Sequence, residues 1–179
     1  MHELKISHNY PNKYWLKYEE NGVTSDDFMR CNYVNFNDKL KFGLNGVVSE
    51  KKILSYDFLF SDGPIVVSQK AAELLSPSEE MGDIQLIEAS LSMNGTSHYG
   101  YKVLNILRSL PCIDMEKSES QPILSYLPDG PRKFSKVVLK RNVKNDFFIA
   151  RSLECNSFIV MSDSLREVFI ENNIIGLEL

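Results

Sequence analysis

Pro64-Ile65-Val66-Val67-Ser68-Gln69 and Phe158-Ile159-Val160-Met161-Ser162-Asp163 share one pattern, an apolar β-branched run that ends at a serine able to cap a helix. Apolar residues at helical spacing follow each serine, and a glycine stands fourteen residues after it, at Gly82 and at Gly176. Because glycine favours the end of a helix, the pattern predicts a strand, a helix and a second strand. The unit occurs twice, 94 residues apart, with its helices expected near 69–76 and 163–172.

The rest of the chain predicts mostly short strands. Aromatic and β-branched residues indicate strands at 13–18, 99–107, 134–140 and 147–149. The proline-rich, polar segment 115–131 is typical of a long exposed loop. The sequence therefore predicts an α+β fold with many short, mostly antiparallel strands, two main helices and two similar strand–helix–strand units.

Residues 1–50 are expected to form a variable, β-rich N-terminal portion, and residues 51–179 the main α+β domain, the two making one compact unit. The 179 residues are 43% hydrophobic, so a sizeable core is available. The formal net charge of −4 argues against nucleic acid as a partner. The one basic cluster is expected to lie at a solvated strand end; it comprises Lys136, Lys140, Arg141 and Lys144.

Three cysteines without a CxxC pair indicate neither a disulfide framework nor a zinc site. The first residues are polar and no stretch approaches the roughly 20 apolar residues that span a bilayer. We therefore expect a cytoplasmic protein that does not act at a membrane and holds no cofactor or metal.

Common catalytic motifs are absent from the sequence. His98 is the one credible general base, although a loop histidine facing solvent is the more common case. Cys112 could pair with it as a nucleophile, but its apolar neighbours are typical of a core thiol. Carboxylates at Asp114, Glu116 and Glu119 could serve acid–base chemistry or form an acidic rim for a basic partner, and we favour the rim.

An ordered set of motifs over roughly residues 52–179 resembles one bacterial family. The set comprises Asp57-Phe58-Leu59, Gly63 to Ser68, Tyr99 to Leu107, Cys112-Ile113-Asp114 with Ser118, Phe147-Phe148-Ile149, Phe158 to Ser162 and Gly176-Leu177-Glu178. The chain is similar in these motifs to the polymorphic-toxin immunity proteins of family eleven, formerly a domain of unknown function. The resemblance implies a protein encoded beside a secreted toxin, often one delivered by contact-dependent or type VI secretion, that protects the producing cell in interbacterial competition.

What the resemblance implies is a toxin inhibitor that acts by stoichiometric protein–protein interaction and is not an enzyme. The expected partner is a cognate toxin domain encoded by the adjacent gene. The candidate toxin-binding residues are Tyr14, Trp15, Asp114, Glu116 and Glu119. Two alternatives stay open: an enzyme that reverses the toxin's modification with His98 and the nearby carboxylates, and a non-catalytic adaptor whose repeated units form a homodimer.

Overall fold

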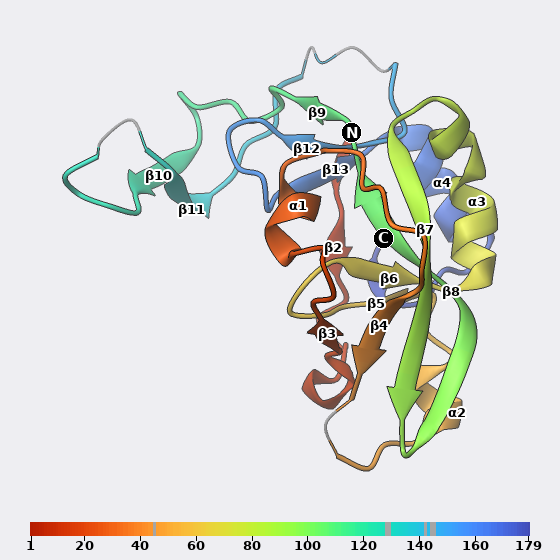
Figure 1. Cartoon of the computed structure of the whole chain (residues 1–179). Helices are drawn as coiled ribbons and strands as arrows, with labels where there is room; N and C mark the ends of the chain where they lie inside the picture. The colour runs from red at the N-terminus through yellow and green to blue at the C-terminus, as the bar shows by residue number, and fades with distance from the viewer. Residues whose placement is uncertain (45, 128–129, 142, 144–145) are drawn as a thin grey trace.

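A computed structural model describes residues 1–44, 46–127, 130–141, 143 and 146–179 (Figure 1). Helices and mostly antiparallel strands are both present, so the predicted α+β class is confirmed. The helices are α1 (Ser25–Met29), α2 (Glu50–Ile53), α3 (Gln69–Glu80) and α4 (Asp163–Glu171), with one 3-10 turn, η1 (Asn12–Tyr14).

A six-stranded sheet holds the larger core. Its strand order is β3-β4-β7-β8-β6-β5, and every neighbouring pair is antiparallel except β4 with β7. The long hairpin of β7 and β8 forms its centre. In sheet order the strands are Lys17–Glu19, Leu40–Gly43, Ile84–Met93, Thr96–Ile106, Ile65–Val67 and Phe58–Leu59.

The described residues form three smaller sheets as well. A four-stranded sheet has the order β1-β13-β12-β9, that is His2–Glu3, Ile159–Met161, Ile149–Ser152 and Ser109–Leu110. The strand β14 (Leu177–Glu178) pairs with β2 (Lys5–Ile6), and β10 (Glu119–Pro122) pairs with β11 (Arg132–Lys136). In Figure 1 the β10–β11 pair projects away from the other sheets.

Both predicted strand–helix–strand units are present, as β6–α3–β7 and β13–α4–β14. Each capping serine works as expected, because the Ser68 Oγ accepts a hydrogen bond from the Ala71 amide and the Ser162 Oγ accepts one from the Leu165 amide. Each helix is followed by a glycine at positive φ, +76° at Gly82 and +117° at Gly176. The shared sequence pattern therefore specifies shared local structure.

The first helix is longer than predicted, since α3 continues through Pro77 to Glu80. Proline lacks an amide hydrogen, so the carbonyl of residue 73 loses its usual helical partner. The Ser76 hydroxyl donates to that Glu73 carbonyl at 2.9 Å. A neighbouring side chain thus compensates for the missing bond, and the helix does not stop at the proline.

The two strands of each unit are separated by a third, antiparallel strand that does not belong to the unit. In the first unit β8 lies between β6 and β7. In the second, the N-terminal segment 2–6 takes this place, pairing with β13 through β1 and with β14 through β2. The Leu4 amide continues the ladder to the Ile159 carbonyl at 2.9 Å. The N-terminus is therefore part of the second unit's sheet.

One large hydrophobic cluster includes residues from both the N-terminal portion and the rest of the chain, among them Leu16, Phe42, Phe58 and Phe169. A smaller cluster lies under the four-stranded sheet, around Cys112, Ile113 and Val160. The smaller cluster supports the base of the projecting β10–β11 pair, because Phe134 and Val137 pack against it.

Three of the predicted strands and the predicted loop need correction. The strand expected at 134–140 ends at Lys136, and the strand expected at 147–149 begins only at Ile149. Residues 12–14 form a 3-10 turn and the strand begins only at Lys17, because Tyr14 turns into the core. The loop expected at 115–131 contains β10, and its partner strand begins at Arg132. In the predicted basic cluster, Lys144 lies outside the described residues.

Candidate partner-binding surface

The strands β10 and β11 pair as a β-hairpin, here called the arm, whose described residues are 119–127 and 130–136 and which begins at a closed base. The Asp114 amide donates to the Val138 carbonyl at 2.8 Å, and the Val138 amide donates to the Ser118 Oγ at 2.9 Å. A bridge between Ile113 and Leu139 continues this pairing toward the smaller hydrophobic cluster. These contacts tie both strands of the hairpin to the body at the base of the arm.

The strands of the arm pair in antiparallel register from Glu119–Lys136 to Pro122–Arg132, with an irregularity after Glu119. The Arg132 Nε donates to the Ser120 Oγ at 2.8 Å, which ties the two strands together by a side-chain contact. Strand pairing and this contact give the arm a defined direction away from the body (Figure 1).

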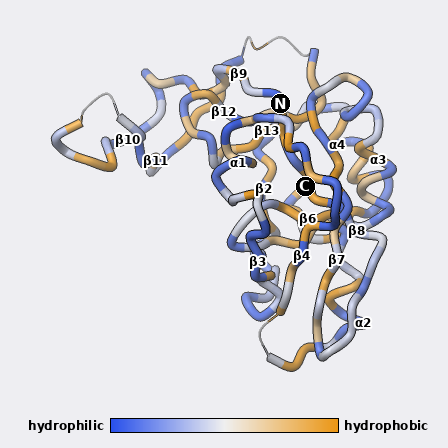
Figure 2. The backbone as a smooth tube through the Cα atoms, in the orientation of Figure 1, coloured by the Kyte–Doolittle hydropathy of each residue, from blue (hydrophilic) through white to orange (hydrophobic). Residues whose placement is uncertain are grey.

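The end of the arm exposes a group of large apolar side chains, here called the apolar tip. It comprises Ile123, Leu124, Tyr126 and Leu127, which are 61%, 40%, 79% and 46% exposed. Figure 2 shows the corresponding orange stretch at the far end of the arm. Single exposed apolar residues are ordinary on a protein surface, but a contiguous group is typical of an interaction site.

The apolar tip was not predicted from the sequence. Four of the five residues at positions 123–127 are apolar, which is the sequence feature that indicates the tip. The prolines at 122 and 128 and the surrounding polar residues favoured a loop. An apolar run inside a segment expected to be exposed is the pattern that would have found it.

The three predicted carboxylates lie at the base of the arm, but they alternate with basic residues. The Asp114 carboxylate accepts from the Lys117 Nζ at 2.6 Å, and this hydrogen bond holds the pKa of Asp114 below its ordinary value. Glu119 lies 3.9 Å from the Lys136 Nζ, and Glu116 is exposed. The base therefore presents mixed charge instead of the purely acidic rim that the sequence suggested.

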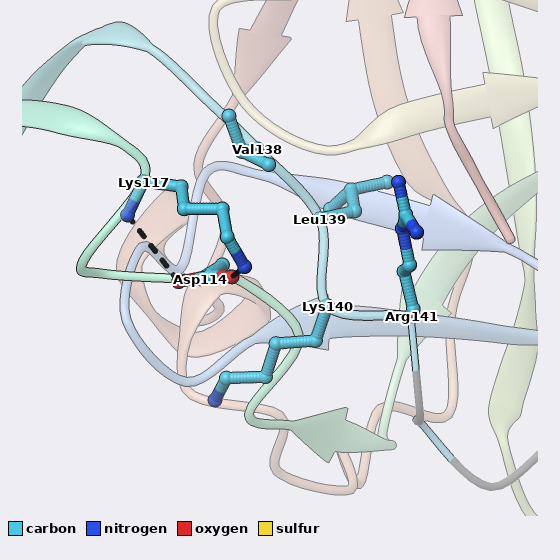
Figure 3. Close-up of a pocket in the computed structure, with 6 residues that line it drawn as sticks. All are labelled: Asp114, Lys117, Val138, Leu139, Lys140 and Arg141. Carbon is cyan, nitrogen blue, oxygen red and sulfur yellow. Dashed lines mark hydrogen bonds and ion pairs between the residues drawn. The ribbon is translucent and has the colours of Figure 1, made fainter.

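A surface depression of about 560 Å³ lies beside these carboxylates. Figure 3 shows Lys117 folded onto Asp114, with Lys140 and Arg141 pointing away from each other. The Lys140 Nζ contacts Glu154 at 3.1 Å, whereas Arg141 has no carboxylate at ion-pair distance within the described part of the chain. The depression is thus lined by apolar side chains, by cations and by the Asp114 carboxylate.

Tyr14 and Trp15 belong to a different part of the molecule. The Tyr14 side chain is only 2% exposed and is not available to a partner at the surface. Trp15 is 43% exposed and stacks on Phe60 with 6.1 Å between ring centroids. In Figure 1 the segment before β3 lies well away from the arm. The structure therefore does not bring Trp15 together with the three carboxylates.

Two buried tyrosines should make the stability of the fold sensitive to alkaline pH. Burial is the main cause that raises the pKa of both Tyr10 and Tyr18 to about 12. The unfolded chain releases these protons near pH 10, so the free energy of unfolding should fall between about pH 10 and pH 12. The fall should be about 2–3 kcal/mol per tyrosine at about 1.4 kcal/mol per pKa unit. Urea titrations followed by Trp15 fluorescence at pH 8, 10 and 11.5 measure it.

The double variant Tyr10→Phe/Tyr18→Phe should show a much flatter pH dependence. Tyr126→Phe is the matched control, because Tyr126 is 79% exposed. In this variant the free energy of unfolding should depend on pH as it does in the wild type. Equal slopes in all three proteins would show that these two buried hydroxyls do not cause the alkaline sensitivity.

The residues of the enzymatic alternative are not brought together. His98 lies near the turn between β7 and β8 and is 3.4 Å from Glu50, on α2. In Figure 1 that turn and the arm lie at opposite ends of the molecule. Cys112 is fully buried in the smaller hydrophobic cluster, and burial raises the pKa of its thiol. Neither the carboxylates at the base of the arm nor Cys112 completes a catalytic arrangement with His98.

A comparison with protein-family models gives no match for this chain, and a comparison with curated proteins gives none. The resemblance to immunity proteins therefore stays a prediction. None of the helices in the described ranges has the length and apolar content that crossing a membrane requires. Within the same ranges, no three His, Cys, Asp or Glu side chains gather as metal ligands.

Proposed function

We propose that this chain is an immunity protein that neutralises a cognate secreted toxin by direct one-to-one binding, with the toxin domain encoded by the adjacent gene. The arm supports this proposal, because it carries the apolar tip away from the body and leaves Tyr126 79% exposed. A solvent-exposed apolar group of this kind gains free energy when a partner covers it.

The composition of the tip fits an inhibitor. Tyrosine buries a large area with little loss of conformational freedom and is common among the residues that dominate binding energy. A hairpin closed at its base loses less entropy on binding than a disordered loop, because its backbone is already ordered. Inhibitor interfaces commonly bury about 1,200–2,000 Å² in total, so the tip would be one part of the contact.

Co-expression tests this proposal in cells. The C-terminal domain of the adjacent gene's product is induced with and without this chain, and growth is followed. We expect growth to stop with the domain alone and to recover when the chain is present. His98→Ala should protect as well as the wild type, because binding does not need a general base. Growth arrest in the presence of the chain would contradict the proposal, and loss of protection by His98→Ala alone would favour the enzymatic alternative.

A further inference from the structure

We propose that the toxin domain adds an extended segment, as a further strand, to the open edge of β7 at residues 84–88. This inference rests on the proposed function and names a contact with the partner that is separate from the arm, since Figure 1 draws the arm and β7 in different parts of the molecule. Three features support it: a missing strand partner, a hydrogen bond at the centre of the edge, and a groove beside it.

The edge is open because β4 covers only part of β7. The strand β7 pairs with β8 from Ile84 to Met93. On its other side it pairs with β4 only from Ala89 to Ser92. Among the described residues, no strand pairs with residues 84–88 on that side. An unpaired edge is a template for an added strand, and residues 84–88 offer a length of about 17 Å at about 3.3 Å per residue.

The Leu86 amide shows which way the backbone groups of this edge point. It donates to the Glu79 carboxylate at 2.7 Å. In an antiparallel pair the amide and the carbonyl of one residue point to the same side, so both groups of Leu86 face away from β8. Glu79 is exposed and belongs to the last turn of α3. Its carboxylate therefore takes the place that the carbonyl of a neighbouring strand would have.

A groove of about 410 Å³ lies beside the edge. One wall is the edge itself, at residues 85–88, and the other is segment 33–39, which leads from α1 to β4 (Figure 1). The Val34 amide donates to the Gln85 Oε1 at 3.0 Å, and the Gln85 Nε2 donates back to the Val34 carbonyl at 2.8 Å. Because side chains stand roughly perpendicular to a sheet, Val34 is held over its face and does not close the edge.

The groove offers apolar contacts as well as backbone groups. Phe36 and Leu86 line it and are partly buried, and Tyr33, which also lines it, is 67% exposed. In strand addition, main-chain hydrogen bonds supply affinity and contacts with alternate side chains supply specificity. The charged residues that line the groove or contact its lining are nearly balanced in sign, so charge does not select the partner here. They are Asp38, Lys39, Glu79, Glu88 and Lys102.

A second copy of this chain is the less favoured occupant. A strand that enters the groove must reach Leu86 past segment 33–39, and the matching edge of a second copy carries the same segment beside it. A single extended segment of another protein does not bring that obstruction. We therefore commit to the toxin domain, and self-association through this edge becomes a result that would overturn the choice.

Calorimetric titration with the adjacent gene's C-terminal domain, made catalytically inactive, tests the inference through two variants with opposite expected effects. Leu86→Pro removes the amide that faces the groove, and proline is tolerated at an edge where the amide does not serve the existing ladder. Glu79→Ala removes the side chain that competes with an incoming carbonyl. The matched control is Glu80→Ala, because Glu80 is exposed, lies next to Glu79 on α3 and carries the same charge.

We expect Leu86→Pro to weaken the Kd by about 30-fold or more, because the ring removes a donor and stands where the added strand must lie. Glu79→Ala should tighten the Kd by about threefold to tenfold, since the Leu86 amide no longer has to give up an internal acceptor. Glu80→Ala should stay within about twofold of the wild type. A residue with a merely structural role would not tighten binding when it is truncated.

Amide hydrogen exchange gives a readout that needs no variant. Exchange at the Leu86 amide should slow by about tenfold or more when the wild-type chain binds the domain, because a carbonyl of the added strand then holds this amide. The Tyr18 amide is the matched control, since it donates to the Asp62 Oδ1 at 2.7 Å on β3, the edge strand of the same sheet. Its exchange should not change.

The outcomes separate the two proposals. Wild-type binding without slower exchange at Leu86, and with an unchanged Kd for Glu79→Ala, would overturn this inference and leave the proposed function standing. No binding by the wild type would overturn both. If thermal unfolding followed by Trp15 fluorescence shows that Leu86→Pro is unfolded, Glu79→Ala and the exchange at Leu86 decide. Slower exchange at Leu86 in the chain alone, as its concentration rises, would assign the edge to a second copy and overturn the choice of the toxin domain.

Discussion

Gly176→Ala should destabilise the fold by about 3 kcal/mol or more, whereas Gly82→Ala should cost only about 1 kcal/mol. The two glycines have equivalent places in the repeated units, each after its helix. A Cβ added at Gly176 would stand 2.5 Å from the Phe58 carbonyl oxygen, and the backbone there has φ +117°. At Gly82, φ is +76° and no atom lies within 4 Å of an added Cβ.

The difference follows from where the second unit packs. The Asp57 and Phe58 amides both donate to the Ile175 carbonyl, at 2.9 and 3.0 Å, so the chain at 175–176 runs directly against β5. The backbone at Gly82 has no such neighbour. Urea denaturation of the two variants, followed by Trp15 fluorescence, measures both costs. Equal losses would show that the close approach of Gly176 to Phe58 adds nothing to the ordinary cost of positive φ.

Asp57→Ala should lower the free energy of unfolding by about 2–4 kcal/mol, because it removes buried hydrogen bonds that join the two units. Asp57 is buried, with 7% of the residue exposed. It accepts from the Ser68 Oγ at 2.8 Å in the first unit and from the Ile175 amide at 3.0 Å in the second. The substitution removes the carboxylate that accepts from the Ile175 amide, and this amide is partly buried.

Asp26→Ala is the matched control, since Asp26 pairs with Arg30 on the surface of α1 and should contribute about 0.5 kcal/mol or less. Urea titrations at neutral pH compare the two losses. A loss for Asp57→Ala no larger than that for Asp26→Ala would mean that water replaces the buried hydrogen bonds and that the carboxylate does not hold the units together.

The repeated units were the part of the fold that local sequence predicted best. Ser68 and Ser162 cap their helices through contacts three residues along the chain, so the signal and its structural effect are both local. The third strand of the first unit, β8, covers most of the strand predicted at 99–107, whereas the third strand of the second unit was not predictable from local sequence. Segment 2–6 fills the second unit from more than 150 positions away, and nothing in its own sequence identifies β13 and β14 as partners.

The candidate site was predicted less well, for a similar reason. Asp114, Glu116 and Glu119 do lie together at the base of the arm, as their spacing requires. Their ion pairs depend on Lys117, which is local, and on Lys136, which only the hairpin register brings close. Tyr14 entered the core because η1 turns its ring inward, and a strand assignment could not show this.

Titrating residual toxin activity against the molar ratio of this chain to the toxin domain is the most direct test of stoichiometric neutralisation. Both proteins are purified, the domain is held well above the Kd, and activity is measured at each ratio. The proposed function predicts a linear fall in activity that ends at one equivalent. Complete protection at a tenth of an equivalent, or full activity at ten equivalents, would contradict neutralisation by one-to-one binding.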